Sequence, residues 1–178
     1  RVVEKCGDRW TIVLAPSMND KFEQISFVNG IYTSIGGKHI NYITNQVNDF
    51  IYEYIKKKYK GINIREAYIR DRYMIFIKTT IENPTFSSQT KEEMTSQPEK
   101  FGSTCILSKT FYSKIVANLP IITDIVNFIK AKEMKDFIGK DTKKKSTLRS
   151  IPKLDDANFA GTNKSEECIL ILTEGDSA

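Results

Sequence analysis

The stretch from residue 39 to residue 58 carries an apolar stripe that fits a long amphipathic helix. Its apolar side chains recur at helical spacing and are Ile40, Ile43, Val47, Phe50, Ile51, Tyr54 and Ile55. The stripe runs into three consecutive lysines, followed shortly by Gly61. Cations suit the last turn of a helix, and glycine suits the position just beyond it. We therefore expect a helix that begins near His39 and ends shortly before Gly61.

Short apolar segments before and after this helix predict strands. In one of them Ile25 and Phe27 share a face, while residues 73–77 are apolar on both faces, which is typical of a buried central strand. Two adjacent glycines, Gly36 and Gly37, indicate a sharp turn or a close backbone approach. Strands are expected at residues 10–14, 25–28, 73–77, 104–107 and 168–172.

Three further helices are expected. Asn63 can cap a short helix that runs to Arg70. Ser108 can cap a helix that ends at Pro120, because proline disfavours helix at the residue before it. Another helix follows over residues 121–138. Strands and helices of this kind place the chain in the α/β class.

Composition excludes several classes of protein. The chain has 178 residues, of which 40% are hydrophobic and 28% are charged, and this is ordinary globular composition. No apolar run approaches the roughly 20 residues that a membrane span needs. Its three cysteines lack a CxxC spacing and its single histidine, His39, has no partner for a ligand set, so a metal would have to bind carboxylates. We expect His39 to be a structural hydrogen-bonding residue at a helix start.

The net charge of +5 is unevenly distributed. Residues 56–72 carry seven Lys or Arg against two acids, and residues 132–153 carry eight against three. Each zone is therefore +5 and the remaining residues sum to −5. Such zones indicate contact with phosphates at defined places, although a solvated surface is the simpler explanation of a lone lysine cluster.

Residues 81–100 predict a long ordered loop, and loops of this length in a compact domain are usually functional. Pro84 stiffens it, and Phe86 can anchor it to the core. Gln89 and Lys91 are then presented from a stiff segment, and a lysine ammonium suits a terminal phosphate. The alternative is a solvated lysine beside the acids that follow it.

The last expected strand is followed by an acidic, glycine-containing turn. Glu174 and Asp176 lie there, where carboxylates can bind Mg²⁺ with further acidic partners. The alternative is that they only favour the start of a helix. A single strand cannot fold alone, so we expect the chain to be a piece of a longer protein.

The sequence resembles the type IIA DNA topoisomerases of the eukaryotic and large-virus type. The resemblance rests on long motifs in the family's order, with FGSTC at 101–105 between them. They are FVNGIYTSIGGKH (27–39), IENPTFSSQTKEEM (81–94), IPKLDDANFAGTN (151–163) and LTEGDSA (172–178). One departure is Gly161-Thr162-Asn163, where the family often shows a second glycine.

The resemblance implies three parts. Residues 1–138 correspond to the transducer domain of the ATPase region, a ribosomal-protein-S5-like mixed sheet with packed helices. Residues 139–165 correspond to a basic linker to the DNA cleavage core, and residues 166–178 to the first strand and turn of a Toprim domain. This piece alone is expected neither to hydrolyse ATP nor to cut DNA, because it lacks the nucleotide-binding domain and the catalytic tyrosine.

The resemblance also implies site residues. Gln89, Thr90 and Lys91 are expected to bind ATP, with Lys91 at the γ-phosphate as a catalytic residue. Glu174 is the expected catalytic Mg²⁺ ligand for DNA cleavage. The lysine run, defined as Lys56, Lys57 and Lys58, is expected to bind the transported DNA segment.

For the whole protein, the resemblance implies ATP-dependent passage of one DNA duplex through a transient break in another. It further implies ATP and Mg²⁺ as cofactors, double-stranded DNA and a second copy as partners, and adjacent ATP-binding and cleavage-core domains in the same chain. No membrane partner is expected; the nucleus is the expected location, with a viral replication site in the cytoplasm as the other. Two alternatives from the residues are a non-enzymatic basic nucleic-acid-binding α/β module and an interaction domain with a basic surface.

Overall fold

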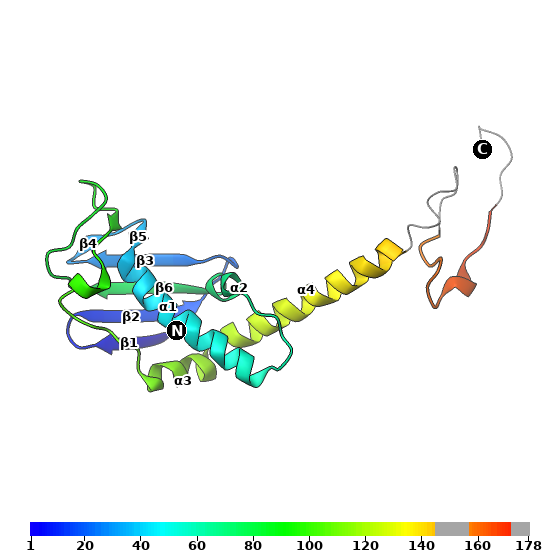
Figure 1. The fold of residues 1–178 in the computed structure, drawn as a ribbon, viewed down its shortest axis with the longest axis horizontal. Coiled ribbons are helices and arrows are strands. Elements are labelled where there is room, and N and C mark those ends of the chain that lie inside the picture. The colour runs from blue at the N-terminus through cyan, green and yellow to red at the C-terminus, as the bar shows by residue number, and fades with distance from the viewer. Residues whose placement is uncertain (145–156, 172–178) are drawn as a thin grey trace. The chain divides into compact units, whose positions relative to one another are not determined.

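The computed structural model describes residues 1–144 and 157–171, with the side chains of 136–144 left out of account. The chain divides into two compact units, residues 1–131 and 132–178. The first unit is a mixed α/β fold (Figure 1). Its expected elements largely appear, and its sheet contains both parallel and antiparallel pairs.

Five strands form the main sheet in the order β1-β2-β6-β3-β4. The pair β3 and β6 is parallel, and the other neighbours are antiparallel. A second, two-stranded parallel sheet pairs β5 with β7. The strands are β1 Val2–Cys6, β2 Trp10–Pro16, β3 Glu23–Val28, β4 Ile31–Tyr32, β5 Gly36–Gly37, β6 Tyr73–Thr79 and β7 Glu93–Met94.

Helix α1 (Lys38–Lys58) lies across one face of the main sheet (Figure 1). The predicted apolar stripe faces the core, since Ile40, Ile43, Val47, Ile51 and Ile55 are buried. The other elements are α2 Glu66–Arg70, η1 Pro98–Lys100, α3 Lys109–Asn118, α4 Ile121–Lys144 and η3 Ser165–Glu167. Strand β6 is the middle strand of the sheet, as its apolar sequence predicts.

The opposite face of the sheet is apolar but only partly covered. The register aligns Val3 with Val13, Val13 with Phe76 and Phe76 with Ile25. Val3 and Ile25 are exposed, whereas Ser26 and Val28 of β3 are buried. Ile25 and Phe27 therefore share a face, as predicted, and this is the partly covered face, because the alternate residues Ser26 and Val28 face the core of the first unit.

Ser108 confirms its predicted role at a helix start. Its Oγ accepts a hydrogen bond from the backbone N–H of Phe111 at 3.0 Å. Helix α3 ends at Asn118, and Pro120 follows. Helix α4 then continues to Lys144, six residues beyond the expected end at residue 138, so residues 139–144 are helical.

Two sequence predictions are wrong. Helix α2 begins at Glu66 with Arg65 as its N-cap, so Asn63 caps nothing. Residues 104–107 form no strand, because side chains of α1 bind their backbone: Tyr42 Oη accepts from the N–H of Cys105, and Gln46 Nε2 donates to the Cys105 carbonyl. The strand expected at 168–172 stays a prediction: its described residues, 168–171, make no strand hydrogen bonds, and a strand needs a partner to be stable.

The described side chains of the second unit are largely exposed. Ile169, Leu170 and Ile171 are 75–82% exposed. Within residues 157–168, backbone hydrogen bonds between residues three apart form a series of turns. Residues 145–156 and 172–178, which include Glu174 and the Lys145 and Arg149 part of the basic zone, lie outside the described residues.

Candidate functional site

The segment that resembles the ATP-contacting loop is a short hairpin. We call residues 85–95 the phosphate hairpin, after the phosphate contact that the sequence resemblance predicts for it. Phe86 and Met94 form an antiparallel bridge, the N–H of Ser87 donates to the carbonyl of Glu93 at 3.0 Å, and the N–H of Thr95 donates to the carbonyl of Thr85 at 2.9 Å. The prediction of an ordered loop is confirmed, and its order comes from these cross-strand bonds.

The hairpin tip is a turn that presents Gln89, Thr90 and Lys91. The N–H of Lys91 donates to the carbonyl of Ser88 at 3.1 Å, and Lys91 has a φ of 57°. Left-handed backbone is unfavourable for a lysine and persists where the surroundings specify it. The Gln89 and Thr90 side chains are exposed at the tip.

Lys91 is half-buried and its ammonium lies 5.9 Å from the centre of the Phe86 ring. Phe86 itself packs against the core, which confirms its predicted anchoring role. Among the described residues no carboxylate lies within ion-pair distance of Lys91. The nearest acid in sequence, Glu92, accepts a hydrogen bond from Thr90 Oγ1 at 3.1 Å and one from Ser34 Oγ at 3.4 Å. The lysine is therefore left with its donors available to an anion.

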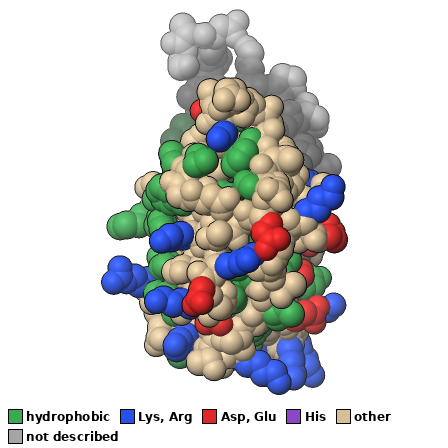
Figure 2. All heavy atoms as spheres, turned by 90° about the vertical axis from the view of Figure 1, so that its left-hand side faces the viewer, with side chains coloured by type: hydrophobic (Ala, Val, Ile, Leu, Met, Phe, Trp, Pro, Cys, Tyr) green, Lys and Arg blue, Asp and Glu red, His purple; other side chains and the backbone are tan. Residues whose placement is uncertain are grey.

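Figure 2 faces the end of the first unit that carries the phosphate hairpin. Lys and Arg side chains alternate there with Asp and Glu side chains and with hydrophobic ones. A surface with both signs of charge does not produce a strong general attraction for anions. An anion bound at this end would therefore have to be held by individually placed donors.

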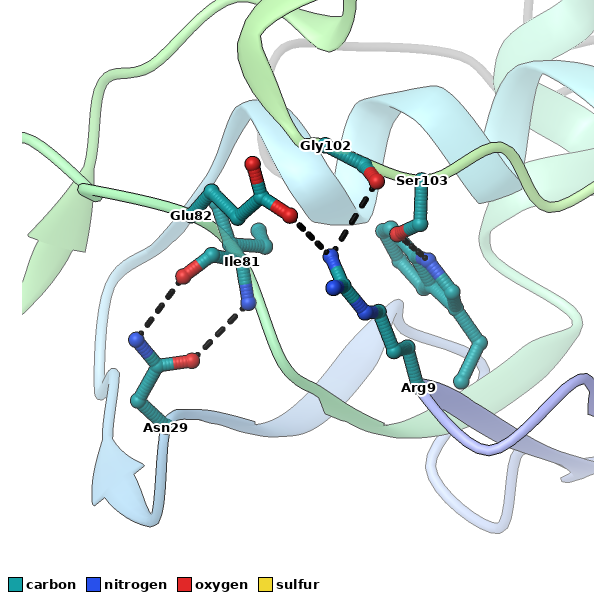
Figure 3. A network of polar contacts seen from close by, with 7 residues as sticks. Arg9, Asn29, Ile81, Glu82, Gly102 and Ser103 are labelled. Carbon is teal, nitrogen blue, oxygen red and sulfur yellow. Dashed lines mark hydrogen bonds and ion pairs between the residues drawn. The ribbon is translucent and has the colours of Figure 1, made fainter.

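A polar network secures the chain just before the hairpin (Figure 3). Asn29 makes two bonds to the backbone of Ile81: its Nδ2 donates to the carbonyl at 2.9 Å, and its Oδ1 accepts from the N–H at 2.8 Å. Arg9 pairs with Glu82 at 2.7 Å and donates to the carbonyl of Gly102 at 3.1 Å. The first and last residues of the segment 81–102 are thus both attached to turns that connect strands of the main sheet.

The hairpin is also attached to the start of α1. Strands β5 and β7 pair Gly36 with Glu93 and Gly37 with Met94, and the N–H of Ile35 donates to the carbonyl of Glu92 at 3.0 Å. His39, in the first turn of α1, is fully buried. Its Nε2 lies 3.4 Å from Thr33 Oγ1, so its predicted structural role is confirmed.

Burial gives His39 an unusual acidity. Desolvation of the charged form lowers the pKa of its imidazole from 6.5 to about 4. The ring is therefore neutral at neutral pH. Within the described part of the chain its Nδ1 has no hydrogen-bond partner.

The lysine run lies at the other end of α1. Lys56, Lys57 and Lys58 are exposed in its last turn. Lys58 Nζ donates to Tyr54 Oη at 3.1 Å, and this hydrogen bond is the main cause that raises the pKa of Lys58. Lys56 lies over the Tyr52 ring at 5.6 Å. The run is a compact positive site at the end of the helix.

Not all of the basic zone at residues 56–72 is available for a ligand. Arg72 forms an ion pair with Asp20, and its guanidinium lies 4.4 Å from the centre of the Phe128 ring. Arg70 lies 4.4 Å over Phe22. These two arginines stabilise the fold, which leaves the exposed lysines and Arg65 of this zone as the DNA-binding candidates.

The described residues do not form a metal site. No three of their His, Cys, Asp or Glu side chains are grouped as ligands. Glu174 and Asp176 lie outside them, so the predicted Mg²⁺ site stays a prediction. None of the helices among those residues combines the length and apolar character that a membrane span requires.

Sequence reasoning missed the residues that hold the hairpin. The sequence did not identify Asn29 or Arg9 as residues that hold the hairpin, because a single asparagine or arginine in a turn can have many roles. The only indication was the Asn29-Gly30 pair, which is typical of a tight turn. The Gly36-Gly37 pair did predict a close backbone approach, and the pairing with β7 confirms it.

Comparison with known proteins gives consistent matches. The family model described as DNA gyrase B matches residues 3–145. DNA topoisomerase 2 top-2 of Caenorhabditis elegans is 46% identical over 178 residues, which cover 98% of this chain and 12% of the relative. Human DNA topoisomerase 2-beta is 46% identical over 177 residues, covering 98% and 11% respectively. The chain therefore spans about an eighth of the length of these relatives.

Solved structures agree with this. The ATPase and transducer domains of DNA topoisomerase II from Balamuthia mandrillaris superpose with a TM-score of 0.73 and 38% identity, over 75% of this chain and 34% of that one. The ATPase region of Saccharomyces cerevisiae topoisomerase II gives a TM-score of 0.65 and 38% identity, over 71% and 32%. The described fold is thus shared with topoisomerase II ATPase and transducer structures.

Proposed function

This chain belongs to the type II DNA topoisomerase family, and we propose that it is the part of an ATP-dependent topoisomerase that senses the γ-phosphate of ATP. The whole enzyme would pass one DNA duplex through a transient break in another. In this proposal residues 1–138 form the transducer, 139–165 the linker to the cleavage core and 166–178 the start of a Toprim domain.

One observation carries the proposal: the Lys91 ammonium is held on an ordered hairpin without an acidic partner among the described residues. An ammonium fixed in this way can meet a phosphate oxygen with little loss of conformational entropy. The amide of Gln89 adds an uncharged donor at the same turn, and the hydroxyl of Thr90, which donates to Glu92 in this structure, becomes a second donor if it rotates away from that carboxylate. This donor set fits a terminal phosphate of ATP bound in an adjacent domain.

Lys91 would act as a sensor of the nucleotide state. With ATP bound, its ammonium donates a charge-assisted hydrogen bond to the γ-phosphate, a bond worth about 1.5–3 kcal/mol. After hydrolysis and phosphate release Lys91 loses this partner. The hairpin and the rest of the first unit are then less strongly held to the ATP-binding domain, so a rigid-body rotation becomes favourable.

The remaining assignments follow from the same proposal. The lysine run would contact the backbone of the transported duplex, and Glu174 would be one Mg²⁺ ligand of the cleavage site, where the metal supports DNA cleavage and religation. The enzyme would act as a homodimer with its ATP-binding and cleavage-core domains in the same chain. Its eukaryotic relatives, such as mouse and human DNA topoisomerase 2-beta, support the nucleus as its location.

Substitution of Lys91 tests the proposal. In the full-length enzyme, Lys91→Ala should lower ATP hydrolysis and ATP-dependent relaxation by about 10- to 150-fold, the equivalent of one charge-assisted bond. Lys100→Ala removes a nearby exposed lysine outside the hairpin and should leave both rates unchanged. Wild-type rates for Lys91→Ala would refute the sensor role and leave the basic nucleic-acid-binding module as the better description.

A further inference from the structure

The phosphate hairpin contacts the start of α1 at a point where only glycine fits. At Gly37 a Cβ would lie 2.1 Å from the carbonyl oxygen of Met94 and 2.7 Å from its nitrogen. Real Cβ atoms do not approach backbone this closely, so any other residue must displace β7. Gly37 also has a φ of 128°, which disfavours every L side chain.

This contact, which we call the joint, connects the start of α1 with strand β7 of the hairpin. On one side Gly37 directly precedes the first helical residue, Lys38, and Gly36 packs on Ile40 of the first helical turn, where a Cβ would lie 3.2 Å from Ile40 Cγ1. On the other side Met94 is fully buried and belongs to the strand that returns from the hairpin tip. Lys91 is only three residues from Met94, so a displacement of β7 moves the ammonium.

The backbone bonds beside Gly37 extend the same joint. Ile35 donates to the carbonyl of Glu92, and Glu93 accepts from Ser87 across the hairpin. The buried cluster of Ser26, Thr33 and His39 holds the segment before Gly37 in place: Ser26 Oγ and Thr33 Oγ1 are 2.6 Å apart. The hairpin is thus fixed to a rigid, buried part of the first unit by close backbone contact.

We propose that Gly37 is a positioning residue for Lys91, because its missing side chain lets β5 fix the phosphate hairpin to the start of α1. The inference rests on the proposed phosphate contact of Lys91 and adds the element that sets its geometry. Since α1 has 21 residues, about 31 Å of helix, the joint also connects the hairpin to the lysine run at the other end of one rigid element.

A double-mutant cycle in the full-length enzyme tests this. Gly37→Ala should lower the kcat of ATP hydrolysis by about 10- to 100-fold, since misplacement by about 1 Å can have that effect. Gly30→Ala is the matched control: Gly30 also has a positive φ, of 81°, but an added Cβ meets nothing within 4 Å. It should leave kcat within about twofold of wild type.

The cycle then separates positioning from general damage. In a Lys91→Ala background, Gly37→Ala should lower kcat by no more than about twofold, because its effect passes through the absent ammonium. An equal loss in both backgrounds would overturn the inference. The inference would also be overturned if Gly37→Ala and Gly30→Ala had the same kcat in an experiment in which Lys91→Ala lowers it. An unimpaired Lys91→Ala enzyme would instead refute the proposed function, and the inference with it.

A second pair covers the case in which Gly37→Ala does not fold. Ile35→Pro removes the N–H that binds Glu92, whereas Ile35→Ala keeps it, and the Ile35 side chain is 64% exposed. Thermal unfolding should confirm that both variants are folded. Ile35→Pro should lower kcat in the Lys91 enzyme and not in the Lys91→Ala enzyme, and Ile35→Ala should lower it in neither. The absence of that pattern would overturn the inference.

Discussion

His39 is the one histidine of the sequence, and its complete burial gives the first unit a specific dependence on pH. The pKa of the folded state is about 4, below the ordinary value of 6.5. Between these values the unfolded chain binds more protons than the folded chain, so stability falls as the pH drops. The loss from this group should reach as much as about 3 kcal/mol near pH 4.

Urea unfolding of the 178-residue chain at pH 7 and pH 5 measures this dependence. His39→Gln should remove its part of the slope, because glutamine does not titrate. The imidazole signal in a proton NMR titration is unambiguous in a chain with one histidine. A midpoint near 6.5 in the folded chain, or an unchanged slope in His39→Gln, would contradict the account.

Asn29 supports the segment that leads into the hairpin (Figure 3). Asn29→Gly removes both bonds to Ile81 and keeps the freedom that a φ of 52° requires. Two buried backbone groups lose their partner, so the free energy of unfolding should fall by about 1–3 kcal/mol. Asn83→Gly is the matched control, since Asn83 is exposed and has a φ of 44°. Equal unfolding midpoints for the two variants would show that the Asn29 bonds are unimportant.

At the scale of elements, the sequence predicted the helices and strands that a hydrophobic period, a cap residue or a proline marks. The long stripe predicted α1, the doubly apolar run predicted the central strand β6, and the Ser108 cap and Pro120 predicted the limits of α3. These features are local, because each depends on neighbouring residues along one element.

Non-local pairing explains the misses. The two-residue strands β5 and β7 pair with each other although they lie far apart in the sequence, and so short a run has no detectable period. Strand β4 is equally short, although it pairs locally with β3 across the Asn29-Gly30 turn. Strand β1 was missed for a related reason: Glu4 and Lys5 hide its apolar alternation. The false strand at 104–107 has an apolar sequence, but Tyr42 and Gln46 of α1 take up its backbone groups.

The lysine run forms the last turn of α1, and the exposure of its side chains favours contact with DNA. Replacement of Lys56, Lys57 and Lys58 by alanine should reduce the stimulation of ATP hydrolysis by DNA in the full-length enzyme. It should also make the dependence of log affinity on log salt shallower by up to about three, because each neutralised phosphate contributes about one.

The control for this prediction removes equal charge elsewhere. Lys5, Lys100 and Lys114 are also exposed, and none lies in the last turn of α1. Their joint replacement by alanine should leave both the stimulation and the salt slope close to wild type. Equal effects of the two triple variants would mean that net charge, and not the position of the run, governs DNA binding.

At the scale of the whole molecule, the proposed enzyme couples a nucleotide contact to DNA cleavage. Glu174→Gln in the full-length enzyme should suppress Mg²⁺-dependent DNA cleavage, because the amide is a weaker ligand than the carboxylate. ATP hydrolysis without DNA should be retained. Glu166→Gln, at an exposed position of η3, is the control. Normal DNA cleavage by the Glu174→Gln enzyme would exclude the Glu174 carboxylate as a metal ligand.

The sensor role requires that the Lys91 ammonium bind the terminal phosphate of ATP held by the adjacent domain. The most direct measurement is a crystal structure of the full ATPase region, with this chain included, bound to a non-hydrolysable ATP analogue. The account predicts that Lys91 Nζ lies about 2.7–3.2 Å from a γ-phosphate oxygen. An ammonium that points into solvent, with the γ-phosphate bound only by other residues, would contradict it.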